Sequence, residues 1–206
     1  MLEQRDLYEI ALAYFKVRAI ERPEFERLLI RSRNDAILPM LRALHTVVGF
    51  GRKPTAEIAR IARRTPQGEL FFRGEWASLE LQSSLDAAHE VVRRIGVNAQ
   101  ESLCKAILEP DYSLRLLAAL LLSMEEHINS DTREFAQVAA NIIGTDRRQA
   151  KRQGELILLF AIVMLHAEDP KWTEFINSWA GARSQTLEEW VAARRKTALV
   201  RLYRSE

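Results

Sequence analysis

The chain has 206 residues, of which 48% are hydrophobic, so it is long enough to bury a substantial core. Its 30 basic and 28 acidic residues leave a formal charge of +2, which excludes a global field that would drive binding to nucleic acid or anionic membrane. The single cysteine, Cys104, excludes an intramolecular disulfide and a thiolate-rich zinc site.

The pattern of apolar residues indicates neither a secretion signal nor a membrane span. Residues 1 to 6 include acids where a signal peptide needs a basic leader and an apolar run. The longest apolar run, residues 156 to 165, is about half as long as a membrane-spanning helix requires. We therefore expect a cytoplasmic protein that does not bind membranes.

Almost every segment shows a helical pattern, and no segment shows the alternation of a strand. The predicted helices, in chain order, are residues 2 to 20, 23 to 31, 35 to 48, 55 to 64, 66 to 73, 76 to 95, 99 to 109, 112 to 128, 132 to 143, 146 to 166, 170 to 180 and 187 to 204. We expect one all-α domain over residues 1 to 206, with N-terminal helices in 1 to 50 and stacked helical hairpins in 55 to 206.

Helix starts are predicted from short polar N-cap residues, from a glutamate three positions later, and from proline in the first turn. The predicted caps are Asn98 with Glu101, Asp131 with Glu134, Thr186 with Glu189, and Asp111 after Pro110, and the first-turn prolines are Pro23, Pro66 and Pro170.

The last six predicted helices form three hairpins, because the connections between paired helices are short. The hairpins begin at Asn98, Asp131 and Asp169, so their starts recur after 33 and 38 residues, a spacing typical of helical repeats. Residues 114 to 122 and 156 to 165 are apolar on every side, which predicts that both segments are buried inside the stack.

One hairpin carries a more specific pattern: an acidic turn with proline, then a helix that opens with an apolar residue, an arginine and, three positions later, an alanine. The residues are Glu109, Pro110, Asp111, Leu114, Arg115 and Ala118. This pattern resembles the HEAT-repeat family, and the resemblance implies a right-handed stack in which the arginine bonds the turn of a neighbouring repeat. Only residues 103 to 122 match well, and an irregular multi-helix bundle is the alternative.

No catalytic or metal-binding pattern stands out, and we expect no cofactor. Asp86 and His89 lie one helical turn apart, but no further ligands accompany them, so we expect an exposed pair on a helix face. Cys104 occupies a core-like helical position and is predicted to be packed. An enzyme whose site is assembled from scattered carboxylates and arginines is a third functional hypothesis, behind the two given below.

Basic residues gather in three clusters, with a local charge of +4 over residues 52 to 73. The clusters contain Arg52, Lys53, Arg60, Arg63, Arg64 and Arg73; Arg147, Arg148, Lys151 and Arg152; and Arg194, Arg195, Lys196, Arg201 and Arg204. Clusters that shared one concave surface would follow a phosphate backbone, as in curved helical-repeat proteins of the DNA-alkylation-repair type. The alternative interpretation is a set of solvated helix faces.

Two patterns overlap the first cluster. Residues 49 to 55 combine glycines with Arg52 and Lys53 before a predicted helix, as in an anion-binding turn, although the Walker spacing is missing. Residues 55 to 72 contain a capped helix, a short break, and a second helix that opens at Thr65 and Pro66 and carries an aromatic pair. This order resembles the helix-turn-helix of TetR-type regulators, which would imply DNA binding.

Three tryptophans near the C-terminus are the remaining candidates. Trp172 and Trp179 lie on one face of a predicted helix, and Trp190 begins the last helix. Such a stripe usually belongs to the core, whereas exposed members would anchor a protein partner. We therefore expect a non-catalytic scaffold or adaptor that binds a protein partner through a helical-repeat surface, and the alternative is a nucleic-acid-binding protein that uses the basic clusters.

Overall fold

The computed structural model describes residues 2 to 16, 21 to 48, 75 to 145, 150 to 166, 168, 170 to 181 and 185 to 204. Every regular element in these ranges is helical, which confirms the predicted all-α fold. The elements are α1 (Gln4–Lys16), α2 (Arg22–Ser32), the 3-10 helix η2 (Arg33–Ala36), α3 (Ile37–Val48), α6 (Glu75–Ile95), α7 (Val97–Ala106), α8 (Tyr112–Met124), α9 (Ser130–Thr145), α10 (Ala150–His166), α11 (Pro170–Gly181) and α12 (Leu187–Arg204).

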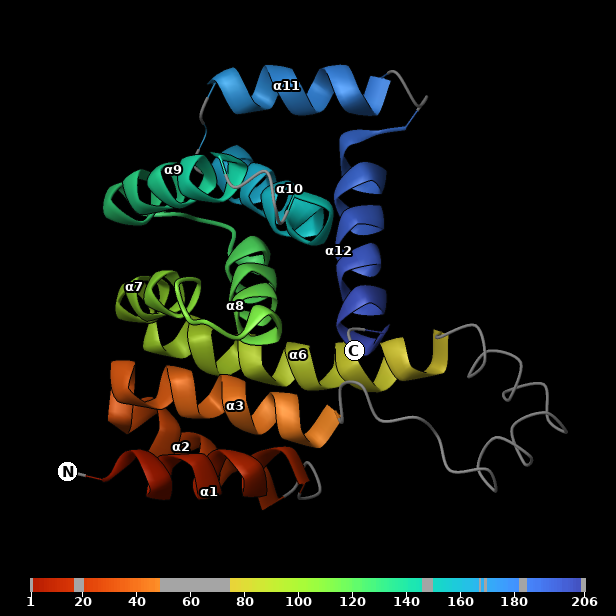
Figure 1. Ribbon diagram of the computed structural model, residues 1–206. Coiled ribbons are helices and arrows are strands. Elements are labelled where there is room, and N and C mark those ends of the chain that lie inside the picture. Colours follow the sequence, from red (N-terminus) through yellow and green to blue (C-terminus); the bar gives the residue numbers. More distant parts are fainter. Residues whose placement is uncertain are drawn as a thin grey trace, which may run out of the picture.

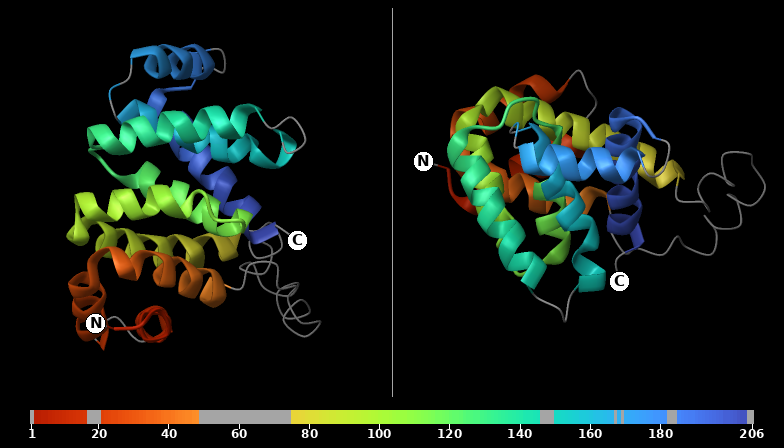
Figure 2. Two further views of the ribbon diagram at one scale, coloured as in Figure 1. Left: turned by 60° about the vertical axis from the view of Figure 1, so that its left-hand side comes forward. Right: turned by 90° about the horizontal axis from the view of Figure 1, so that it is seen from above.

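The helices lie in successive layers (Figure 1). Helices α1, α2 and α3 form one end of the molecule, and α6 packs across α2 and α3. The hairpin of α7 and α8 follows, then the hairpin of α9 and α10, and α11 lies at the opposite end. Helix α12 runs along one side of the molecule from α11 back to α6, and it contacts α6, α8 and α10 on the way (Figure 2).

Helix α8 lies at the centre of the core. Its residues from Leu116 to Ser123 are all buried, because α3, α6, α7, α10 and α12 pack around it. In α10 the run from Leu159 to Met164 is also completely buried. The prediction that these two apolar segments are interior is confirmed, and the two helices pack directly against each other.

Polar contacts join the N-terminal layer to α6. The Tyr14 hydroxyl donates a hydrogen bond to the Ala87 carbonyl at 3.0 Å, and the Arg94 guanidinium pairs with the Glu26 carboxylate at 3.0 Å. Burial, with the nearby Glu26 charge, raises the pKa of Tyr14 to about 12, so the phenol stays protonated and remains a donor. The Arg22 guanidinium lies over the Tyr14 ring, 5.7 Å from its centre.

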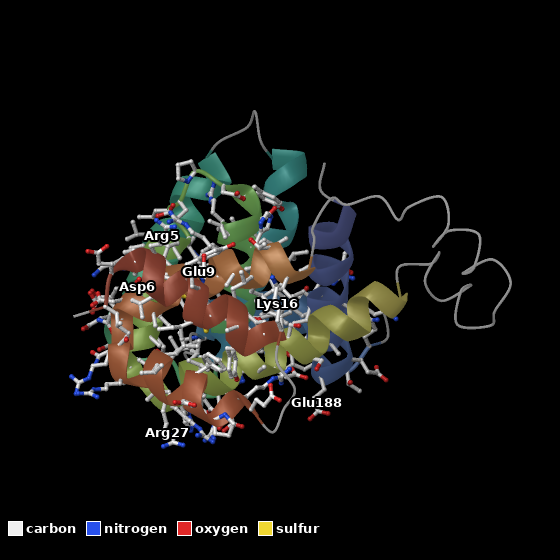
Figure 3. The ribbon with its side chains drawn as sticks, turned by 90° about the horizontal axis from the view of Figure 1, so that it is seen from below. Arg5, Asp6, Glu9, Lys16, Arg27 and Glu188 are labelled. Carbon is white, nitrogen blue, oxygen red and sulfur yellow. The ribbon has the colours of Figure 1, made fainter. Side chains whose placement is uncertain are left out.

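The outer face of α1 is a mixed charged surface. Figure 3 shows Arg5, Asp6, Glu9 and Lys16 along this helix at the end of the molecule. All four side chains are exposed, and acids and bases are interspersed. A helix face of this kind is well solvated, so α1 offers no single-sign patch to a charged partner.

Two of the predicted helix starts are confirmed by their hydrogen bonds. The Asp111 Oδ1 atom accepts from the Ser113 amide at 2.8 Å and from the Leu114 amide at 3.3 Å. The Thr186 amide donates to Glu189 Oε2 at 2.9 Å, and the Glu189 amide donates to Thr186 Oγ1 at 3.2 Å, which together form a complete capping box.

Two other predicted caps are each wrong by two residues. Helix α7 begins at Val97, because Gly96 adopts a φ of 77° and redirects the chain just before it, so Asn98 lies inside the first turn. Helix α9 is capped by Asn129, whose Oδ1 atom accepts from the Thr132 amide at 2.8 Å, and Asp131 therefore lies in the first turn of α9.

The HEAT-like pattern predicts that Arg115 bonds a neighbouring repeat, and the structure places its contact elsewhere. The Arg115 Nε atom donates to the Ile107 carbonyl at 2.9 Å, which lies at the end of α7 in the same hairpin. The arginine therefore fixes the turn between α7 and α8. The predicted helices 55 to 64 and 66 to 73 and the possible anion-binding turn at residues 49 to 55 lie outside the described residues.

Replacement of Asp111 by alanine is expected to reduce the free energy of unfolding by about 1 kcal/mol, because two amides at the start of α8 lose their acceptor. Urea denaturation followed by circular dichroism measures the change. The matched control is Asp131→Ala, which removes a first-turn acid that is not the cap and should cost less than about 0.5 kcal/mol. An equal or larger loss for Asp131→Ala would contradict the assignment of the caps.

Candidate binding surface on helices α7 and α9

Helices α7 and α9 lie side by side on the flank of the molecule (Figure 2). A groove of about 430 Å³ lies between them. Val97, Glu101 and Lys105 line it from α7, and Asp131 and Phe135 line it from α9. These positions recur at helical spacing, so each set forms one stripe along its helix.

Large apolar side chains are exposed beside this groove. Val97 is 64% exposed at the start of α7, and Val138, one turn after Phe135 on α9, is 56% exposed. Leu108, just after α7, is 54% exposed. We call Val97, Glu101, Lys105, Phe135 and Val138 the α7–α9 surface. Two of the four exposed large hydrophobic side chains among the described residues, Val97 and Val138, therefore belong to this surface.

The residues that line the groove carry a small net negative charge. The Lys105 ammonium donates to the Glu101 carboxylate at 2.6 Å, so these two charges offset each other. Asp131 adds an exposed carboxylate at the start of α9. The charged lining residues thus carry one net negative charge, which favours a ligand with a basic group beside its apolar part.

Cys104 lies at the base of the groove and is buried, as predicted. Burial raises the pKa of its thiol to about 12, although a hydrogen bond with Thr132 acts in the opposite direction. The thiol is therefore protonated at neutral pH and is a poor nucleophile. Its role is packing between α7 and α9.

A network of hydrogen bonds centred on Gln100 joins α7 to the connection between α8 and α9. The Gln100 Nε2 atom donates to the His127 carbonyl at 2.7 Å and to Glu125 Oε2 at 3.2 Å. Its Oε1 atom accepts from the Asn129 side chain at 3.0 Å and from the Asn129 amide at 3.2 Å. One buried side chain of α7 thus holds the connection from α8 to α9, and this fixes the spacing between α7 and α9.

The histidine candidate on α6 belongs to the same network. His89 Nε2 lies 2.9 Å from Glu125 Oε1, and both side chains are largely buried. The predicted exposed pair of Asp86 and His89 is therefore wrong for His89, which faces inward while Asp86 is exposed. Among the described residues, no group of three or more histidine, cysteine, aspartate or glutamate side chains is arranged to hold a metal ion.

The tryptophan candidates lie in different environments. Trp190 is completely buried, so in this structure it belongs to the core and is not presented to a partner. Trp172 is half-buried and packs against the core from α11. The Trp179 side chain lies outside the described residues, although α11 itself is described.

The basic candidates fall mostly outside the part of the chain that the structure describes. This applies to Arg52, Lys53, Arg60, Arg63 and Arg64, and to Arg147 and Arg148. Lys151 and Arg152 lie in the first turn of α10, and their side chains are not among those described. In the C-terminal cluster, the side chains of Arg201 and Arg204 are likewise not among those described. Arg194 is half-buried and Lys196 is exposed.

Arg195 has a structural contact that sequence reasoning missed. Its guanidinium donates to the Ser123 carbonyl and to the Ser123 hydroxyl, and so joins α12 to the end of α8. Burial lowers the pKa of Arg195, and burial together with the Arg195 charge lowers the pKa of His166. The Arg195 guanidinium is therefore already engaged inside the protein and does not lie free on the surface.

Comparisons of the chain with protein-family models, with curated proteins and with solved structures found no match. Within the described residues, no helix combines the length and the apolar character needed to cross a membrane.

Proposed function

We propose that the protein is a non-catalytic scaffold that binds an amphipathic helix of a protein partner in the groove of the α7–α9 surface. The observation that carries this proposal is the exposure of Val97 and Val138 on either side of a groove held open by a buried polar network. An apolar helix face lying in a groove is a common form of protein recognition.

The charge of the groove specifies the partner further. Glu101 and Lys105 neutralise each other, and Asp131 leaves a net negative charge next to the apolar residues. A partner helix with an apolar face and a lysine or arginine at its edge complements this surface. Contact with that basic residue would make association weaken as the salt concentration rises.

The architecture that we propose for this scaffold is a short HEAT-like stack, right-handed as the resemblance implies. It is supported by the packing of α7 against α9 and of α8 against α10, since equivalent helices of successive repeats are neighbours in such a stack. Helix α12 departs from a simple repeat because it also contacts α6 and α8. We therefore propose a stack of helical hairpins in which the last helix, α12, covers one side.

A photo-activated cross-linking residue placed at Val97 or at Val138 tests the function in cells that express the protein. We expect a specific cross-linked partner at both positions and none at Glu9, an exposed position on the outer face of α1 (Figure 3). The same pattern at all three positions, or no product at the α7–α9 positions, would exclude this surface as the binding site.

The purified partner then provides a quantitative measurement. Val138→Asp should weaken its binding about tenfold or more, because burial of an apolar side chain is replaced by burial of a charge. Thermal unfolding should stay unchanged, since Val138 is more than half exposed. Glu9→Gln is the control variant. If random duplex DNA binds the protein with a steep salt dependence, while no cross-linked protein is found, the nucleic-acid alternative replaces this proposal.

A further inference from the structure

A second hollow, of about 820 Å³, lies where α2 ends and η2 begins, and Asn98 in the first turn of α7 also lines it. Its volume falls within the range of small-molecule binding pockets. Leu2, Leu7 and Leu28 form an apolar part of its lining, and Arg31, Arg33 and Asp35 add charged groups. None of the residues that define the α7–α9 surface lines this hollow.

The two arginines carry charges that nothing in the described structure neutralises. Neither guanidinium lies within ion-pair distance of a described carboxylate, Asp35 included. The charged residues that line the hollow are thus two arginines, unpaired among the described residues, and one aspartate, which together carry a net charge of +1. Guanidinium groups bind carboxylates through paired, charge-assisted hydrogen bonds.

Arg33 also has an unusual backbone conformation. Its φ of 50° and ψ of −128° lie in a region that residues with a side chain rarely adopt, and it follows the last residue of α2. Glycine adopts this conformation without steric cost. The chain nevertheless has an arginine there, and strained positions of this kind gather at ligand-binding sites.

From this arrangement we propose that the hollow binds a monoanionic aliphatic carboxylate. The ligand's carboxylate pairs with Arg31 and Arg33, and its aliphatic part lies against Leu2 and Leu28. Asp35 disfavours a doubly charged group such as a phosphate monoester, because the dianion would face a like charge. The carboxylate belongs either to a free fatty acid or to the C-terminus of a peptide that ends in an aliphatic residue.

Calorimetric titration of the full chain with octanoate and with an acetylated peptide ending in leucine tests the proposal. Each acid should bind about tenfold or more tightly than its neutral carboxamide, because the amide loses the charge-assisted bonds. Acetate, which lacks the tail, should bind much more weakly than octanoate. Tighter binding of octanoate identifies a free amphiphile as the source, and tighter binding of the peptide identifies a chain terminus. Equal binding of the acids and their amides, or no binding of either acid, would overturn the proposal.

Two variants connect the binding to these residues. Arg31→Gln and Arg33→Gly should each weaken octanoate binding about tenfold. Arg33→Gly should also leave the melting temperature unchanged or raised, because glycine relieves the backbone strain, so a loss of binding in that variant does not come from misfolding. Arg27→Gln, which changes an exposed arginine of α2 outside the lining of the hollow (Figure 3), is the control. Unchanged binding in both test variants would also overturn the proposal.

Discussion

Replacement of Trp190 by alanine is expected to reduce the free energy of unfolding by about 3 to 5 kcal/mol, the usual loss when a large buried aromatic side chain is removed. Trp190 has no exposed surface and is the largest of the fully buried side chains in the described core. It lies in the first turn of α12, the helix that contacts α6, α8, α10 and α11. The cavity left by alanine would therefore weaken the packing of α12 against the core.

Trp190→Phe is the matched control. The indole Nε1 atom has no hydrogen-bond partner among the described residues, so phenylalanine loses volume but breaks no polar contact. We expect a loss of less than about 2 kcal/mol for this variant. Both values come from urea denaturation followed by circular dichroism. A loss below about 1 kcal/mol for Trp190→Ala would show that α12 adds little to the stability of the core.

The second large effect is expected at Gln100, where replacement by leucine should cost about 3 kcal/mol. Leucine fills a similar volume but removes every hydrogen bond that Gln100 makes to Glu125, His127 and Asn129. Partly buried donors and acceptors then lose their partners, and each such loss costs about 1 to 3 kcal/mol before the structure relaxes. The connection from α8 to α9 should loosen as a result.

Hydrogen exchange distinguishes this mechanism from general destabilisation. In Gln100→Leu the Asn129 amide should exchange faster than in the unaltered protein under conditions where the amides of α1 do not change. Glu101→Gln is the control on the next residue of α7, and it breaks only the exposed pair with Lys105, so its cost should stay below about 0.5 kcal/mol. Equal stability losses in the two variants would contradict a supporting role for Gln100.

The helices themselves could be located well from the sequence, because their signals are local. The predicted span 187 to 204 agrees with α12, and the capping box of Thr186 and Glu189 is formed as expected. The helix caps predicted at Asn98 and Asp131 were wrong. A polar residue caps a helix only where the preceding chain turns, and that turn depends on Gly96 in one case and on Asn129 in the other.

The candidate site could not be predicted in the same way. A glutamine within a predicted helix does not indicate whether it is buried or exposed. The hydrogen-bond partners of Gln100 lie 25 to 29 positions away in the sequence, and only the tertiary fold brings them close. Val97 and Val138 look like ordinary core positions in the sequence, because apolar periodicity does not show which face of a helix remains uncovered. Arg195 was grouped with surface cations, although its partner Ser123 lies in the core helix α8.

The course of α12 has a consequence for how the molecule folds. Its contacts with α6 join segments that are far apart in sequence, so their formation has to close a long loop of chain. An open array can lose one terminal unit at a time, whereas here removal of the last helix exposes several layers to water together. We therefore expect a single cooperative melting transition and slower refolding than an open array of the same helices would show.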